Sequence, residues 1–147
     1  MGSILDIFSN RAFMASTASW VTAQLLKVLL SYRKEHGLDF RRFVSPGGMP
    51  SSHAAAVSSL AVAVAREFGW GSTYTAIVIV FGLIVMYDAA GVRRAAGKQA
   101  AILNKILGEL RQLRALRNER LRELLGHTPV EVVAGAVLGV AIGMLSP

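Results

Sequence analysis

The sequence predicts an all-α membrane protein, a bundle of four transmembrane helices in a single membrane domain over residues 1–147. Three observations carry this prediction. Hydrophobic residues make up 53% of the chain and charged residues 17%, and the mean hydropathy is +0.47, so the chain is more apolar than most soluble domains. Four stretches approach the roughly 20 apolar residues that cross a bilayer as a helix. Most Lys and Arg residues lie between these stretches.

The four apolar stretches differ in composition. The first is apolar apart from Gln24, Lys27 and a few hydroxyl groups, and the third is the most hydrophobic. The second is rich in Ala and Ser rather than Leu, which is typical of a helix enclosed by other helices. The predicted spans cover about residues 12–32, 50–68, 73–92 and 128–145.

The fourth span carries a glycine stripe. Gly135, Gly139 and Gly143 are four residues apart, so they lie on one face of a helix. Such a face lets another backbone approach closely. We expect a homo-oligomer that pairs through this stripe.

Basic residues predict the orientation. Thirteen Lys and Arg residues lie in the connections between spans one and two and between spans three and four, whereas the other side has only Arg11 and Arg66. Because Lys and Arg are retained on the cytoplasmic side, both connections should be cytoplasmic. We therefore expect a multi-pass protein of the inner membrane of a prokaryotic cell.

The connection over residues 97–125 has apolar residues at helical spacing between Lys and Arg residues, which predicts a basic amphipathic helix on the cytoplasmic side. Such a helix lies on the anionic leaflet, pairs with its copy or binds an acidic partner. The formal charge of +7 also raises the question of nucleic acid. Aromatic residues are only 7% and no recognition module is present, so we expect no specific nucleic-acid partner.

The chain has no cysteine. This excludes a disulfide scaffold, a thiolate metal site and a cysteine nucleophile. Catalysis would have to use His, Ser, Asp, Glu, Lys or Arg, and we assign no metal ligands.

The start of the second span is a candidate anion site. Two glycines and Pro50 precede Ser51, Ser52 and His53, so a helix begins there after a tight turn. The first N–H groups of a helix have no intrahelical partners and attract anions, and the serine hydroxyls add donors. Alternatively, a serine only caps its own helix.

The fourth span begins with His127 and Thr128. Glu131 follows Thr128 by three residues, which is a capping-box pattern. Glu131 also follows His127 by four residues, close enough to hold the imidazole tautomer. Both roles of Glu131 remain open on sequence alone.

Two further polar positions stand out within the spans. Asp88 lies near the end of the third span, just before Arg93 and Arg94. A charge within the membrane is energetically costly, so such a residue usually forms an ion pair or has a function. Asp88 either belongs to the site or forms a purely structural ion pair with Arg93 or Arg94. Lys27 is a cation inside the first span that either faces the bundle or extends to the interface.

These polar groups should converge on the cytoplasmic face. Cations and helix N–H groups can stabilise the charge of a phosphoryl group, while one imidazole attacks phosphorus and the other protonates the leaving oxygen. Two histidines can divide these roles without a metal. The residue set therefore indicates phosphoryl transfer.

The sequence resembles the type-2 phosphatidic acid phosphatase superfamily, which includes the vanadium haloperoxidases, and within it a divergent membrane branch of short proteins. The resemblance is carried by Gly47-Gly-Met-Pro-Ser-Ser-His53, by Tyr87-Asp-Ala-Ala-Gly-Val-Arg93 with Gly97, Gln99 and Asn104, and by Leu124-Leu-Gly-His-Thr-Pro129. These motifs occur in the order that this branch shows.

The resemblance implies residue roles. His127 would be the nucleophile that forms a phosphohistidine, and His53 the acid for the leaving group. Glu131 stands where the superfamily has an aspartate that orients the nucleophile. No Ser-Arg pair lies six residues before His127, so Arg93 would contact phosphate instead. The remaining implied residues are Ser51, Ser52, Lys27 and Asp88 at the phosphate, with Gln99, Asn104 and Arg94 in secondary positions.

We therefore expect a lipid phosphatase that hydrolyses a phosphate monoester of a phospholipid precursor at the cytoplasmic face, with phosphatidylglycerophosphate as first choice. No cofactor is expected to be required, and assistance by Mg²⁺ is left open. The alternatives are a polyprenyl diphosphate phosphatase and a non-catalytic membrane protein that binds anions or lipids.

Overall fold

The computed structural model describes residues 3–35, 48–111 and 126–146, and this part of the chain is helical and contains no strand. The all-helical prediction is thus confirmed. A short 3₁₀ helix η1 precedes the longer helices, and a π-helical segment η3 separates α3 from α4. In chain order the elements are η1 (Ile4–Ser9), α1 (Arg11–Glu35), α2 (Ser52–Phe68), α3 (Thr73–Tyr87), η3 (Asp88–Val92), α4 (Arg93–Arg111) and α5 (Pro129–Leu145).

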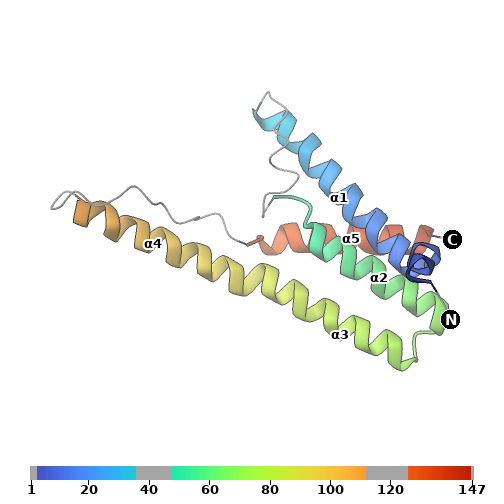
Figure 1. The fold of residues 1–147 in the computed structure, drawn as a ribbon. Coiled ribbons are helices and arrows are strands. Elements are labelled where there is room, and N and C mark those ends of the chain that lie inside the picture. Colours follow the sequence, from blue (N-terminus) through green and yellow to red (C-terminus); the bar gives the residue numbers. More distant parts are fainter. Residues whose placement is uncertain (1–2, 36–47, 112–125, 147) are drawn as a thin grey trace.

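Helix α2 is the centre of the bundle, with α1, α3 and α5 packed around it (Figure 1). Its Ala- and Ser-rich sequence explains this position, because small side chains allow neighbouring helices to approach on several sides. Two serines of α1 donate hydrogen bonds to α2 carbonyls, Ser16 to Ala56 at 3.1 Å and Ser19 to Ala55 at 3.0 Å. The enclosed second helix predicted from composition is therefore observed.

The glycine stripe of α5 packs within the chain. A Cβ atom at Gly135 would overlap the carbonyl oxygen of Ser51, and one at Gly139 would overlap that of Ala55. At Gly143 it would lie 2.9 Å from the Ser59 oxygen. All three glycines are buried. The predicted use of this stripe between copies is therefore wrong, because α2 of the same chain already occupies that face.

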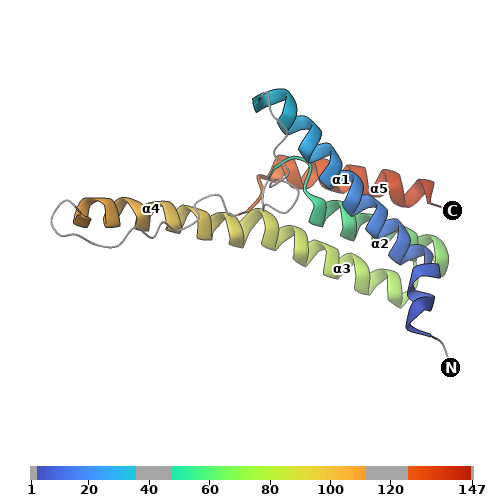
Figure 2. The same ribbon diagram turned by 45° about the horizontal axis from the view of Figure 1, so that its top comes forward.

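Helices α3 and α4 form one long rod through η3, and α4 extends beyond the bundle in both views (Figures 1 and 2). The expected separate helix from residue 97 is thus corrected, since helix continues from Thr73 to Arg111. Isolated glycines such as Gly91 and Gly97 weaken a helix without ending it. The rest of that expected helix, residues 112–125, lies outside the described residues.

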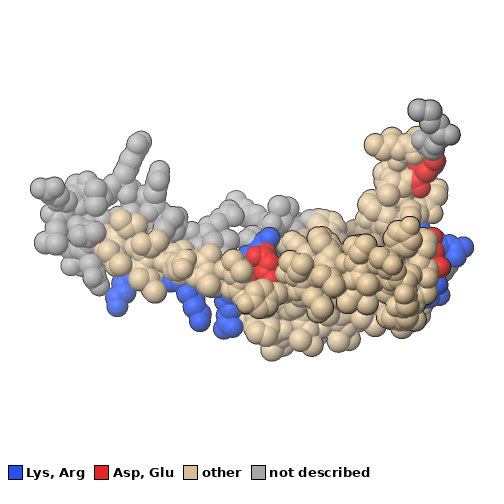
Figure 3. All heavy atoms as spheres, turned by 90° about the horizontal axis from the view of Figure 1, so that it is seen from below, with Lys and Arg blue, Asp and Glu red and all other residues tan. Residues whose placement is uncertain are grey.

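The surface of the bundle is divided into apolar and charged zones. Seen from below, charged side chains gather at the two ends of the bundle and along α4, and the middle carries none (Figure 3). Within the described residues, two helices are long and apolar enough to cross a membrane, Arg11–Ser31 and Thr73–Gly108, and Pro129–Leu145 is a shorter apolar helix. The number of membrane crossings stays a prediction.

Candidate active site

The site is built where α2 and α5 begin side by side. Ser51 caps α2, its hydroxyl accepting a hydrogen bond from the Ala54 N–H at 3.4 Å. Its own N–H donates to the Glu131 carbonyl of α5 at 2.9 Å. Gly135 leaves room for this contact one turn further along α5. The two helix N-termini are thereby joined, and each carries a histidine.

Backbone contacts with η3 hold His127 in place. Its N–H donates to the Ala89 carbonyl in η3 at 2.9 Å. Gly126 has a φ of +94°, and a Cβ atom there would overlap the backbone of Arg93 and Arg94. Because a π-helical turn disrupts the regular α-helical ladder, η3 can present a carbonyl to another segment. The segment before α5 is therefore held against η3.

Glu131 performs both of the roles that sequence left open. Its Oε2 atom accepts from the Thr128 N–H at 3.0 Å, while the Thr128 hydroxyl accepts from the Glu131 N–H at 3.3 Å. The same Oε2 lies 3.2 Å from Nδ1 of His127. The capping box thus holds the carboxylate in position against the imidazole.

The His127 side chain is almost fully enclosed, with the residue only 4% exposed. Burial lowers the pKa of His127 below its usual 6.5, and the charge of Lys27 adds to this shift. The hydrogen bond and negative charge of Glu131, together with a backbone hydrogen bond at Gly48, oppose it. The balance favours a neutral imidazole at pH 7. A neutral ring with Nδ1–H donated to a carboxylate has its lone pair on Nε2.

The His53 ring meets the His127 ring. Their centroids are 6.2 Å apart and the planes are inclined by 63°. His53 is exposed, whereas its neighbours Ser52 and Ala54 are buried. The two imidazoles, 74 positions apart in the sequence, thus share one location at the start of two helices.

Lys27 of α1 faces the site. The residue is only 3% exposed, so its side chain is enclosed by the bundle. A Cβ atom at Gly48 would lie 3.3 Å from Cγ and Cδ of Lys27, so the turn before α2 covers the stem of this lysine. The charge of Lys27 acts on both histidine rings and on Glu131.

Arg93 and Asp88 form an ion pair across η3, with Nε of Arg93 2.7 Å from Oδ2 of Asp88. Both side chains are partly exposed, at 49% and 40%. Their charges also act on the His53 ring. Since Asp88 engages Nε, the two terminal nitrogens of the guanidinium group can point elsewhere.

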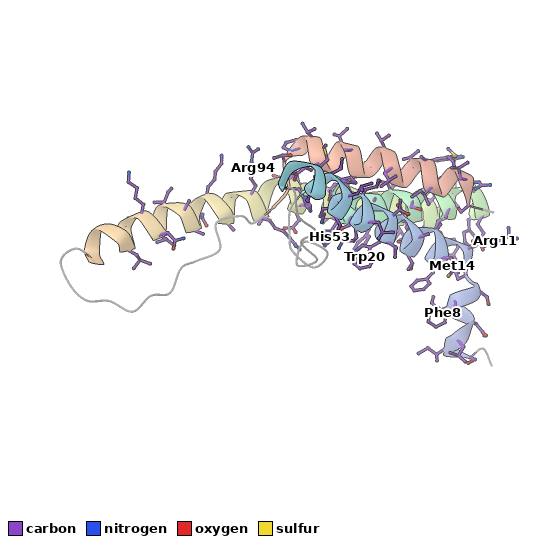
Figure 4. All side chains as sticks on the ribbon, turned by 90° about the horizontal axis from the view of Figure 1, so that it is seen from above. Phe8, Arg11, Met14, Trp20, His53 and Arg94 are labelled. Carbon is purple, nitrogen blue, oxygen red and sulfur yellow. The ribbon has the colours of Figure 1, made fainter. Side chains whose placement is uncertain are left out.

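The other predicted site residues differ in their burial and in their distance from the histidines. Ser51 is fully buried and caps its helix, and Ser52 is 3% exposed. Arg94 has an exposed side chain at the end of the bundle from which α4 projects, the end where His53 also lies (Figure 4). Gln99 and Asn104 lie further along α4, about 9 and 16 Å beyond Arg93. The structure does not bring these two residues to the histidines, because α4 leads away from the bundle.

Sequence reasoning missed three contributors. The Ala89 carbonyl holds the His127 backbone, Gly126 allows that segment to touch η3, and Gly48 lies over Lys27. Only the glycines left a signal in the sequence, because both lie within the two histidine motifs. Among the described residues, no three of His, Cys, Asp and Glu are grouped as a metal site would require.

A cavity of about 220 Å³ lies at the opposite end of the bundle. Arg11 and Arg66 line it with Glu67 and Ser146. Arg11 and His53 are at opposite ends in Figure 4. This cavity therefore does not belong to the histidine site.

Comparison with known proteins shows the family to which this chain belongs. The family model described as "Divergent PAP2 family" matches residues 8–142. The uncharacterized membrane protein YuiD of Bacillus subtilis (strain 168) is 36% identical to this chain over 152 aligned positions, which cover 96% of each protein. No solved structure matches. A match over almost the whole chain establishes that the protein belongs to the divergent PAP2 family.

Proposed function

We propose that the protein is an integral membrane lipid phosphatase that hydrolyses a phosphate monoester through a phosphohistidine. The observation that carries the proposal is the pairing of the His53 and His127 rings, 6.2 Å apart, at two joined helix N-termini. A nucleophile and an acid must each lie about 3 Å from its reacting atom. Two rings at this separation can therefore reach opposite sides of one phosphoryl group.

Nε2 of His127 attacks phosphorus, and a nitrogen–phosphorus bond forms as the bond to the lipid alcohol oxygen breaks. Protonated His53 donates its proton to that oxygen. Water then attacks the phosphohistidine, His53 accepts a water proton, and the nitrogen–phosphorus bond breaks to release inorganic phosphate. Glu131 stabilises the positive charge that develops on the His127 ring.

The phosphate is held by charge and by helix N–H groups. Lys27 and the free terminal nitrogens of Arg93 supply cations, and Asp88 positions Arg93. The first N–H groups of α2, near Ser52 and His53, supply further donors. Ser51 serves as the cap that keeps these donors in place, and its hydroxyl is not assigned to the substrate.

The membrane arrangement is part of the proposal. Four spans, α1, α2, α3 and α5, would place the site at the end of the bundle that carries the basic connections, facing the cytoplasm. The relative YuiD is named a membrane protein, and the uncharged middle of the bundle in Figure 3 supports this arrangement. A precursor phospholipid made at the inner leaflet, first phosphatidylglycerophosphate, fits such a site.

Phosphate release by the purified protein in detergent tests the proposal. Phosphatidylglycerophosphate and a polyprenyl diphosphate are offered in parallel, each with EDTA and with Mg²⁺. We expect release from the monoester, a loss of about a thousandfold in His127→Ala and in His53→Ala, and no loss in Arg66→Gln, at the opposite end of the bundle. Stronger release from the diphosphate would favour the polyprenyl alternative. A folded wild type as inactive as both variants would contradict hydrolysis and leave an anion- or lipid-binding protein.

Orientation is tested separately in intact cells. The chain lacks cysteine, so single residues can be labelled without background. We expect Ser3→Cys to react with an impermeant reagent from outside and Lys105→Cys only after the cells are opened. Labelling of Lys105→Cys from outside would overturn the cytoplasmic site.

A further inference from the structure

Helix α4 has a large surface that the described chain does not cover. It extends from the end of the bundle, and its only extensive contact with another described element is with η3. Figures 1 and 2 show it as a rod leading away from α2 and α5. Three large apolar residues on it are exposed, Ile102 at 61%, Leu103 at 49% and Ile106 at 46%.

Leu103 and Ile106 lie on a different face of α4 from the basic residues, and Ile102 lies between the two faces. Arg94, Lys98 and Lys105 are separated by four and seven residues, which places them within about 40° of each other around a helix. Figure 3 shows Lys and Arg side chains in a row along one edge of α4. Leu103 and Ile106 lie roughly 130° away from this basic row.

The face of α4 that carries Leu103 and Ile106 has the spacing of a helix-pairing seam, with Ala96 and the polar Gln99 at the two preceding positions. Ala96, Gln99, Leu103 and Ile106 follow one another at intervals of three, four and three residues. This is the alternation of the a and d positions in a coiled coil. The basic row then occupies c and f positions, which remain in water when two such helices pair.

The direction of α4 indicates whether a lipid surface or a second copy of the chain covers this seam. If α3 crosses the membrane, α4 continues along nearly the same line, and Leu103 lies about 16 Å beyond the end of η3. A helix bound to a lipid surface lies in the plane of the interface instead. Two copies inserted in the same orientation in a symmetric dimer are related by an axis along the membrane normal, so their α4 helices run parallel to each other.

We propose that α4 is a dimerisation helix that pairs in parallel with α4 of a second copy through the seam of Leu103 and Ile106. The membrane confines both copies and raises their effective concentration, so a short seam is sufficient. This interface takes the place of the glycine stripe, which α2 occupies. The proposal depends on α3 crossing the membrane and not on catalysis.

Cysteine cross-linking in lipid nanodiscs or native membranes tests the pairing. Leu103→Cys and Ile106→Cys lie on the seam, and Lys98→Cys and Lys105→Cys are matched controls on the basic row. Under mild oxidation, we expect the seam variants to form disulfide dimers several times faster than the controls, since only paired seams bring Cβ atoms to disulfide distance. The difference should persist when the protein is diluted with lipid.

A second variant keeps the test independent of any local damage from cysteine. Ile106→Asp should abolish cross-linking through Leu103→Cys, while Lys105→Asp should leave it intact. Equal cross-linking on both faces, or none on the seam, would overturn the proposal. A fluorophore attached at Ile106→Cys provides a further test. If its emission shifts to the blue only in anionic vesicles and no cross-link forms, α4 lies on lipid and the proposal is overturned.

Discussion

The two ends of the α2–α5 pair use charge in different ways. At the far end, the Arg66 guanidinium donates to the carbonyls of Gly143 at 3.1 Å, of Met144 at 3.0 Å and of Ser146. This cation satisfies the last carbonyls of α5, as a helix C-terminus requires. At the near end, Glu131 caps α5 and also contacts His127.

The two ends differ in what their charged side chains contact. Arg66 is paired with backbone carbonyls of its neighbouring helix. At the near end, two imidazoles and the charges of Lys27 and Arg93 act on one another across helices. Between the ends, the glycine stripe fixes the distance from α2 to α5. Variants at the near end should therefore change chemistry, and variants elsewhere along the pair should change stability.

After the two histidine variants described above, the largest effect is expected from Glu131→Gln. The amide preserves the shape of the cap but removes the negative charge that stabilises the His127 cation, so phosphate release should fall about a hundredfold. The pKa of His127 should also fall further, because the opposing carboxylate is lost. The acidic limb of the pH–rate profile should then move to lower pH. A fall in rate with an unmoved limb would assign Glu131 to capping alone.

Gly139→Ala sharpens the comparison in the middle of the pair. The added Cβ would overlap the Ala55 carbonyl, so the free energy of unfolding should fall by about 1–3 kcal/mol. Gly108→Ala is the matched control, because nothing lies within 4 Å of a Cβ there. Thermal unfolding in detergent measures both. An unchanged midpoint in Gly139→Ala would contradict the close α2–α5 contact.

The pH dependence of the wild type distinguishes the buried histidine from a surface one. Because the pKa of His127 is lowered in the folded state, the unfolded state binds its proton first as pH falls. The stability that the neutral ring contributes is present above pH 6.5 and is lost below it. The acidic limb of kcat/KM should also lie below 6.5. A limb above 6.5 would contradict a nucleophile at His127 with this environment.

The smallest effect is expected from Arg66→Gln. Loss of the charged donor from exposed carbonyls should lower the free energy of unfolding by about 1 kcal/mol. Phosphate release per folded molecule should not change, since Arg66 lies at the other end of the pair. A marked loss of activity at equal folded fraction would show that the two ends are coupled.

Much of the fold was predictable because helix periodicity and apolar length are local properties. All four apolar segments are helical, and three of them end close to their expected bounds, whereas the third continues to Arg111. The capping box of Thr128 and Glu131 was recognisable from their spacing of three residues. The partner of the glycine stripe was not predictable. A glycine stripe indicates that another backbone approaches closely, but it does not indicate whether that backbone belongs to the same chain.

The candidate site shows the same division. His53, His127 and Glu131 were identified by their residue types and motifs, whereas Gln99 and Asn104 were included through the family resemblance alone. The continuous helix through η3 removes the latter two from the histidines, since each residue of α4 adds about 1.5 Å of distance. Contacts such as His127 N–H to the Ala89 carbonyl involve backbone groups that every residue possesses, so no side chain signals them.

The sequence by itself determined the helices, their caps and the types of chemical group available, because these depend on residues within a few positions of one another. Only the tertiary structure decided that Lys27 faces the histidines, that α2 covers the glycines of α5, and that the His53 and His127 rings meet. The physical reason is that packing around α2 brings together segments that are far apart in the chain. The fit between the surfaces of these helices depends on all of them together and cannot be predicted from a local sequence pattern.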